Sequence, residues 1–150
     1  MARKFAQGKF TPLNPDKYAG NKTPTYRSGW ELTFMQFCDN HPSVVQWASE
    51  AVTIPYKNPL TGKNTIYVPD FFIVYQDKRG KRRAELIEVK PIKQTTMENA
   101  KSLRDKAAVA VNYAKWEAAN AWCKRQGIIF RVVTENDIYH SGGRKKWPKN

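Results

Sequence analysis

Two apolar, β-branched segments that carry charged residues constrain the fold of this chain more than any other feature. Residues 65–75 contain Pro69-Asp70, and residues 86–89 contain Glu88, with Lys90 directly after them. Acidic side chains are disfavoured in strands, and a buried carboxylate costs free energy unless a cation lies nearby. Because strand side chains alternate between faces, Glu88 and Lys90 point the same way. The pattern predicts two strands that bring Asp70, Glu88 and Lys90 to one place.

Two carboxylates and an ammonium group on one face favour metal-assisted phosphodiester hydrolysis. This reaction needs a hydroxide near neutral pH and relief of charge at the phosphate, and Mg²⁺ held by carboxylates provides both. Asp70 and Glu88 are the expected Mg²⁺ ligands, with Mn²⁺ as a substitute and the Val89 carbonyl as a candidate third ligand. Lys90 is expected to orient the attacking water or to stabilise the pentacovalent phosphate. Glu31 adds a carboxylate from a predicted helix.

Each of these residues also has an ordinary structural interpretation. Glu31 follows Ser28 by three residues and fits a capping box, so capping alone explains it. Asp70 fits an edge-strand or turn acid beside a proline, and Glu88 with Lys90 fits a solvated charge pair on a one-sided sheet. Taken singly, these interpretations are favoured. Together, a helix that carries Glu31, a segment with Pro69-Asp70 and a segment with Glu88-x-Lys90, in this order along the chain, favour a catalytic site. The spacing of the two histidines does not suggest a metal site.

The pattern of apolar residues and breakers predicts one α/β domain. A helix is expected from Ser28 to about residue 38, and a longer helical region, as one helix or two, from the Thr95–Glu98 capping pattern to Gln126, with Gly127 as its terminator. Strands are expected at residues 44–47, 52–56, 65–75, 85–90 and 128–134. Pro69 predicts an edge, a bend or a bulge in the third of these strands. The order of elements is typical of a small mixed sheet flanked by helices.

The charge of the chain points to DNA as its partner. There are 26 Lys and Arg against 13 Asp and Glu, a formal net charge of +13. Such an excess favours a polyanion, although basic charge alone does not exclude other roles. The expected contacts to the DNA backbone include a basic run beside the candidate site; they are Arg27, Lys78, Arg79, Lys81, Arg82, Arg83 and Lys93.

The ends of the chain differ in composition from its centre. Residues 1–25 predict a basic, irregular N-terminal arm, residues 26–140 an endonuclease-like core, and residues 141–150 a basic C-terminal tail. Cys38 and Cys123 lie in apolar helical contexts and are expected to be buried free thiols. No segment has the length and hydropathy of a membrane span, so no membrane partner is expected.

These residues resemble the PD-(D/E)xK nuclease superfamily. Residues 26–31 are similar to the RSxxE helix start of phage Holliday-junction resolvases and of the endonuclease subunit of heteromeric transposases. Pro69-Asp70 and Glu88-Val89-Lys90 occupy the paired-strand positions of the family, and residues 113–127 and 132–138 are similar to the helix and strand that close the transposase-type domain. Over essentially the whole chain, including residues 7–15, the sequence resembles the head completion proteins of T-even-type phages.

The resemblance implies a single-domain, restriction-endonuclease-like α/β fold and a metal-dependent endodeoxyribonuclease. It implies that Glu31 belongs to the active site. Transposase-type members have Gln at the position of Glu88, so the complete Glu88-x-Lys90 motif of this chain implies an intact metal site. It also implies action on double-stranded DNA after packaging, with phage head or portal proteins as partners. The expected location is the host cytoplasm during assembly, with the virion head as a second location.

Two other functions stay open at this level. One is a catalytically silent nuclease fold that serves as a DNA- or portal-binding head completion protein, and the other is a junction-resolving nuclease. The oligomeric state, the DNA specificity and the number of metal ions cannot be read from the residues. Glu50 follows a Trp-containing strand, and a structural role is the favoured interpretation for it.

Overall fold

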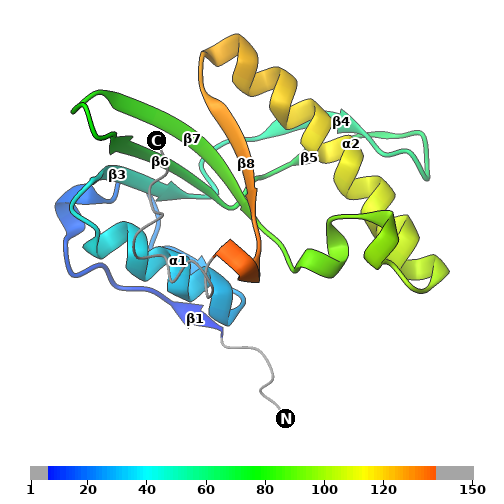
Figure 1. Ribbon diagram of the computed structural model, residues 1–150, viewed down its shortest axis with the longest axis horizontal. Helices are drawn as coiled ribbons and strands as arrows, with labels where there is room; N and C mark the ends of the chain where they lie inside the picture. Colours follow the sequence, from blue (N-terminus) through cyan, green and yellow to red (C-terminus); the bar gives the residue numbers. More distant parts are fainter. Residues whose placement is uncertain (1–6, 138–150) are drawn as a thin grey trace.

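A four-stranded mixed sheet forms the centre of the computed structural model, which describes residues 7–137. Its strands, in spatial order, are β3 (Val44–Ser49), β6 (Phe71–Gln76), β7 (Arg82–Val89) and β8 (Ile129–Val133). The first three are antiparallel, whereas β8 runs parallel to β7 (Figure 1). This arrangement confirms the predicted α/β fold with a mixed sheet flanked by helices.

Helix α1 (Gly29–Asn40) covers one face of the sheet. Ser28 caps the helix, because its Oγ accepts a hydrogen bond from the Glu31 N–H at 3.1 Å, as the capping pattern predicts. Phe34 and Cys38 are buried against Ile87 and the other residues of β3, β6 and β7 that point to this face. Burial of this apolar stripe holds the start of α1 beside the strand ends.

Helix α2 (Leu103–Gln126) packs through Trp116 and Ala119 against Leu86, on the opposite face of the sheet from Ile87. Gly127 ends the helix in the left-handed conformation (φ 75°), as predicted. The predicted start at Thr95 is wrong. Two 3₁₀ turns, η2 (Ile92–Gln94) and η3 (Met97–Asn99), precede α2, and Ser102 caps the helix instead. The extended, buried Ala100 separates η3 from α2 and explains the late start.

The predicted strand at residues 65–75 is two strands that belong to two different sheets. β5 (Asn64–Tyr67) pairs with β4 (Ile54–Lys57), while β6 joins the central sheet. The chain bends between them at Pro69, because proline lacks the N–H that a continuous ladder requires. The sequence had suggested that Asp70 lies inside a strand. In the structure Asp70 lies at the junction just before β6.

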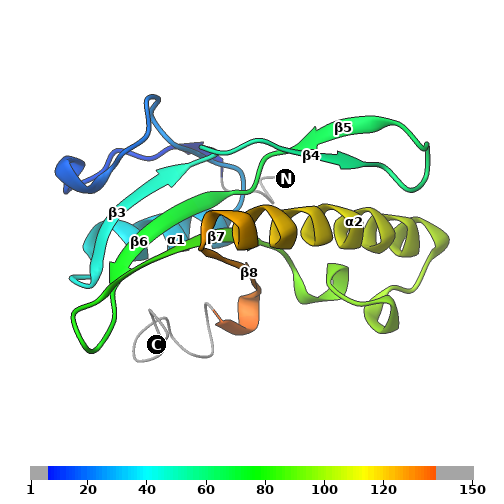
Figure 2. The ribbon, with the colours of Figure 1, turned by 90° about the horizontal axis from the view of Figure 1, so that it is seen from above.

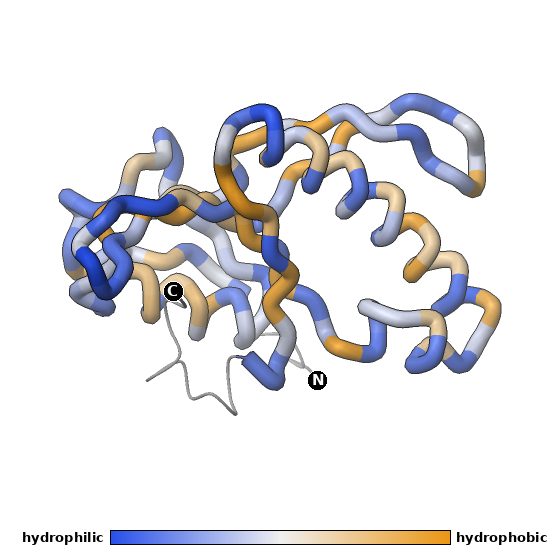
Figure 3. The backbone as a smooth tube through the Cα atoms, turned by 45° about the horizontal axis from the view of Figure 1, so that its top comes forward, coloured by the Kyte–Doolittle hydropathy of each residue, from blue (hydrophilic) through white to orange (hydrophobic). Residues whose placement is uncertain are grey.

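The β4–β5 hairpin extends from the central sheet and lies along α2 (Figure 2). Ile54 and Tyr67 are its buried residues, and they join the cluster around Trp116. Hydrophobic residues run through the strands at the centre of the molecule, and hydrophilic residues occupy the turns (Figure 3). Cys38 and Cys123 are buried and free, as expected, and none of the helices in residues 7–137 could span a membrane.

The described part of the N-terminal arm packs against the sheet. β1 (Gly8–Lys9) pairs with β2 (Thr25–Tyr26), and the 3₁₀ turn η1 (Pro15–Lys17) lies between them. Tyr18 then forms a β-bridge to Trp47 on the edge strand β3. The predicted tail at residues 141–150 and the last residues of the predicted core, 138–140, lie outside the described residues.

Asp39 attaches the arm to the end of α1. Its side chain is 1% exposed and accepts hydrogen bonds from the backbone N–H groups of Leu13 at 2.7 Å and Asn14 at 3.0 Å. Lys17 Nζ donates to the Asp39 carbonyl oxygen at 3.0 Å. A buried carboxylate with these partners holds a segment 25 residues away in sequence.

We expect Asp39→Ala to lower the free energy of unfolding by about 2 to 4 kcal/mol, because two hydrogen bonds to a charged group are lost and their donors stay partly buried. Urea denaturation measures this change, and limited proteolysis should show faster cleavage within residues 10–20. Asp16→Ala is the matched control, because Asp16 is exposed. Equal stability of the two variants would contradict the attachment by Asp39.

Candidate active site

Asp70, Glu88 and Lys90 come together where β6 begins and β7 ends. Phe71 pairs with Ile87 across the two strands, and this register places the preceding Asp70 beside Glu88. Asp70 Oδ2 accepts a hydrogen bond from the Val89 N–H at 2.7 Å. Lys90 Nζ lies 3.5 Å from Glu88 Oε2, so the two side chains share a face as alternation predicts. This junction lies at the centre of the molecule, between the start of α1 and the middle of α2 (Figure 1).

The two carboxylates at the junction repel each other. Burial raises the pKa of Asp70 well above its usual range, and the charges of Glu88 and Glu31 raise it further. Burial also raises the pKa of Glu88, although Lys90 partly offsets this effect. Ionised carboxylates in such a place need a cation, and Lys90 supplies only one positive charge. The electrostatics therefore favour a bound divalent cation.

The donor set at the junction fits Mg²⁺. Within residues 7–137, no cluster of three or more His, Cys, Asp and Glu side chains has metal-site spacing, so the candidate set is two carboxylates and a backbone carbonyl. Among the described residues, none donates a hydrogen bond to Asp70 Oδ1. The N–H and C=O of one strand residue point to the same edge, so the Val89 carbonyl faces Asp70 as its N–H does. Oxygen donors of this kind are those that Mg²⁺ prefers.

Glu31 borders the site from the first turn of α1. Its Oε1 accepts a hydrogen bond from the Arg27 N–H at 3.0 Å, so the side chain does close the start of the helix. Burial raises its pKa, and its charge contributes to the raised pKa of Asp70. Glu31 thus has a capping role and an electrostatic influence on Asp70 at the same time, and the two interpretations do not compete.

Tyr67 and Lys115 also contact the site, and neither was predicted from the sequence. The Tyr67 hydroxyl donates a hydrogen bond of 2.7 Å to Glu88 Oε1, and Lys115 Nζ lies 5.5 Å from the centre of the Tyr67 ring. Burial and the charge of Lys90 lower the pKa of Lys115, while Glu88 and Asp70 act in the opposite direction. The signal for Lys115 was its helical spacing, three residues after the buried Asn112 and four before the buried Ala119.

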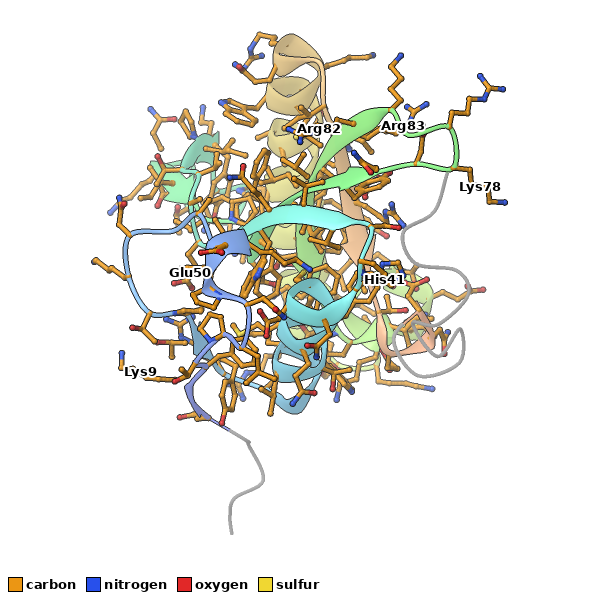
Figure 4. The ribbon with its side chains drawn as sticks, turned by 90° about the vertical axis from the view of Figure 1, so that its left-hand side faces the viewer. Lys9, His41, Glu50, Lys78, Arg82 and Arg83 are labelled. Carbon is orange, nitrogen blue, oxygen red and sulfur yellow. The ribbon has the colours of Figure 1, made fainter. Side chains whose placement is uncertain are left out.

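The predicted DNA-binding residues divide into two groups. Arg27 lies near the site, because its N–H donates to Glu31 Oε1 at 3.0 Å, and its guanidinium pairs with Glu50 at 2.5 Å. Lys93 is exposed in η2, three residues after Lys90. The other five, Lys78, Arg79, Lys81, Arg82 and Arg83, lie in the turn between β6 and β7 and at the start of β7. Figure 4 shows Lys78, Arg82 and Arg83 at this end of the hairpin.

The expectation that this basic run lies beside the site is wrong. The turn follows β6, whereas Asp70 precedes it, and six strand residues at about 3.3 Å each separate the two by roughly 20 Å. The reason is the antiparallel pairing of β6 with β7, which sends the connecting turn to the far end of the sheet. Arg83 also pairs with Asp77 at 2.8 Å, which takes up part of its charge.

Comparison with known proteins assigns the chain to a family. The family described as "TnsA-like endonuclease N terminal" matches residues 41–135. The head completion nuclease of Enterobacteria phage T4 is 34% identical over 142 residues, covering 87% of this chain and 92% of that relative. The chain belongs to the TnsA-like endonuclease family. The family match spans Asp70, Glu88, Lys90 and Lys115, whereas Glu31 and the arm precede it.

Membership in this family agrees with the resemblance to PD-(D/E)xK nucleases. The TnsA-like match contains the central sheet and α2, and these elements position the carboxylates and the lysines. The relationship to the phage nuclease covers more of the chain than the endonuclease match does. The chain is therefore an endonuclease-family protein with a single-domain mixed α/β fold.

Proposed function

We propose that this protein is a Mg²⁺-dependent endonuclease that hydrolyses phosphodiester bonds of double-stranded DNA. The observation that supports this most is the meeting of two mutually repelling carboxylates, the partly buried Asp70 and the buried Glu88, with one ammonium group at the junction of β6 and β7. Family membership adds the class of reaction, and the net charge of +13 adds a polyanionic partner.

Asp70, Glu88 and the Val89 carbonyl would hold the Mg²⁺, with Mn²⁺ as a substitute. The bound ion supplies Lewis acidity at the phosphate and a hydroxide near neutral pH. The Lys90 ammonium, held 3.5 Å from Glu88, orients the attacking water and stabilises the negative charge that develops on the phosphate. Glu31 adds negative charge beside Asp70 and fixes the start of α1 at the site.

Tyr67 and Lys115 act as positioning residues for Glu88. The tyrosine hydroxyl donates to Glu88 Oε1, while the Lys90 ammonium lies nearest to Oε2, so the two partners fix both oxygens of the carboxylate. Lys115 lies above the ring of Tyr67 and places a second positive charge near Glu88. Fixing a ligand in this way maintains the geometry that a metal site needs.

We expect Lys115→Met to lower the rate of DNA cleavage about tenfold at saturating DNA, because Glu88 loses a nearby charge and Tyr67 loses its cation contact. The variant should also reach half-maximal cleavage at a lower Mg²⁺ concentration, because a positive charge that repels the ion is lost near Glu88. Lys106→Met is the matched control, because Lys106 is exposed on the same helix. Equal rates and equal Mg²⁺ requirements in the two variants would remove Lys115 from the site.

The basic residues hold the DNA backbone at two places. Arg27 and Lys93 lie close enough to the site to contact phosphates next to the cut. The β6–β7 hairpin, roughly 20 Å from Asp70, contacts the duplex farther along, still within one helical turn of about 34 Å. Contacts of this kind carry little sequence information, so the proposal includes no sequence specificity.

The biological role that we propose is completion of phage heads after DNA packaging, with head or portal proteins as partners. This role rests on the relative, which is named a head completion nuclease. A complementation experiment tests it: filled heads from a phage that lacks this protein are incubated with wild-type or Lys90→Met protein, and infectious particles are counted after tails are added. We expect the wild type alone to restore infectivity. Restoration by both proteins would favour the catalytically silent alternative.

A further inference from the structure

The N-terminal arm and the end of β3 enclose a hollow of about 830 Å³ beside the candidate active site. The loop after Tyr18 forms one wall, and residues 49–51 form the other. Figure 4 shows Lys9 and Glu50 on this side of the molecule, apart from the basic β6–β7 hairpin. Arg27, which contacts phosphates next to the cut, is one of its lining residues, and the others take no part in the cleavage site.

Two hydrogen bonds connect the wall of the hollow directly to the site. The Glu50 N–H donates to the Asp70 carbonyl oxygen at 2.9 Å, and the Arg27 N–H donates to Glu31 Oε1 at 3.0 Å. Glu50 holds a left-handed backbone conformation (φ 53°), which is unfavourable for a residue other than glycine. The wall of the hollow therefore directly adjoins Asp70 and Glu31.

The hollow is formed before any ligand binds. Tyr18 packs edge-on against Trp47 with 4.7 Å between ring centres, and the Ala19 N–H donates to the Trp47 carbonyl at 2.8 Å. Gly20 permits this packing, because a Cβ at that position would lie 2.3 Å from the Tyr18 hydroxyl oxygen. On the other side of Tyr18, Asp39 and Lys17 hold the arm to α1. A preformed concave site loses little entropy when a ligand binds.

The lining of the hollow matches the chemistry of a nucleotide. Lys9, Lys22 and Arg27 supply three cations against the single carboxylate of Glu50, which Arg27 neutralises at 2.5 Å. Asn21 and Thr25 add polar groups that can pair with a base edge. A concave site of this size accommodates one nucleotide but not a double helix, so an unpaired nucleotide is the part of a DNA strand that can enter it. The volume also falls in the range of about 300 to 1,000 Å³ that holds one small ligand.

We propose that this hollow binds an unpaired nucleotide of the DNA strand next to the cut, with its phosphate on Lys9 and Lys22. The inference rests on the proposed function and adds to it a preference for DNA that has unpaired nucleotides beside a duplex, such as an overhang or a flap. Arg27 lies between the hollow and the carboxylates and contacts the phosphate that connects the two places.

Fluorescence anisotropy in EDTA tests this inference, because binding is then measured without cleavage. One labelled duplex is used with a blunt end and with a short unpaired overhang. We expect the wild type to bind the overhang DNA about tenfold more tightly than the blunt-ended DNA. An increase of this size is typical of one charge-assisted phosphate contact together with base contacts. Lys22→Ala should remove most of this preference, and Gly20→Ala should reduce it by displacing Tyr18. Lys63→Ala, an exposed lysine next to β5, is the matched control and should keep it.

Equal affinity of the wild type for the two DNAs would overturn this inference and leave the proposed endonuclease intact. A preference that Lys22→Ala and Lys63→Ala reduce to the same extent would also overturn it, because the preference would then reflect overall charge. Absence of binding to either DNA would contradict the proposed function as well.

Discussion

Asp70→Asn is expected to abolish DNA cleavage and, at the same time, to stabilise the folded protein. Asparagine keeps an oxygen that can accept the hydrogen bond from the Val89 N–H, but it removes the negative charge that a metal ion requires. Burial and the charges of Glu88 and Glu31 raise the pKa of Asp70, so its ionised form disfavours folding. We expect cleavage to fall at least about 1,000-fold and the free energy of unfolding at pH 7 to rise by about 1 kcal/mol.

The stability effect also has a predicted dependence on pH. A carboxyl group whose pKa is raised by folding destabilises the protein above its unfolded pKa of about 3.9, and the cost disappears when both states are protonated. Urea denaturation should therefore show the difference between wild type and Asp70→Asn shrinking as the pH falls toward 4. Asp16→Asn, at an exposed position, should be neutral for both stability and cleavage. A variant that still cleaves DNA, or one that is clearly less stable, would be inconsistent with the assigned site.

Lys90→Met is expected to lower the rate of cleavage by about 100- to 1,000-fold while DNA affinity changes less than about threefold. The methionine side chain keeps the length and the packing of the lysine but cannot stabilise charge in the transition state, and the loss of one such group has effects of this size. Lys90 is partly buried beside Glu88, so it adds little to the positive surface that attracts the DNA. Single-turnover rates at saturating protein separate the two quantities.

Lys93→Met is the matched comparison, because this lysine lies three residues away and is exposed. It should weaken DNA binding and its salt dependence while the single-turnover rate stays near that of the wild type. The two variants therefore have opposite expected signatures. If Lys90→Met instead reduced affinity and left the rate unchanged, Lys90 would be a DNA-binding residue and the catalytic assignment would be wrong.

The centre of the candidate site could be predicted from the sequence because it depends on local rules. Side-chain alternation places Glu88 and Lys90 on one face, and the structure shows them 3.5 Å apart. The Ser28 cap could likewise be predicted, because Glu31 follows Ser28 by three residues, and the cap positions Glu31 at the start of the helix. The meeting of Asp70 with Glu88 needed one further assumption, that their two segments pair, and the register of β6 with β7 satisfies it.

The remaining features depend on tertiary structure and could not be predicted in this way. The apolar pattern continues on both sides of Pro69-Asp70, so it indicates a bend there but does not reveal that β5 pairs with β4 in a separate sheet. The direction of the β6–β7 turn decides where the basic run lies, and a charge count has no direction. Lys115 follows Glu88 by 27 residues in the chain, and the two come close only because α2 packs against the sheet. The hollow under the arm depends on contacts of Tyr18 with Trp47, which no local pattern indicates.

Cleavage of supercoiled plasmid DNA tests most directly whether the protein is a metal-dependent endonuclease. Purified wild-type protein and the Lys90→Met variant are compared in parallel, each with Mg²⁺, Mn²⁺, Ca²⁺ or EDTA. We expect nicked and linear DNA from the wild type with Mg²⁺ or Mn²⁺, little product with Ca²⁺ or EDTA, and little product from the variant with any ion. Cleavage that persists in EDTA, or equal cleavage by both proteins, would contradict a metal-dependent site at Asp70, Glu88 and Lys90.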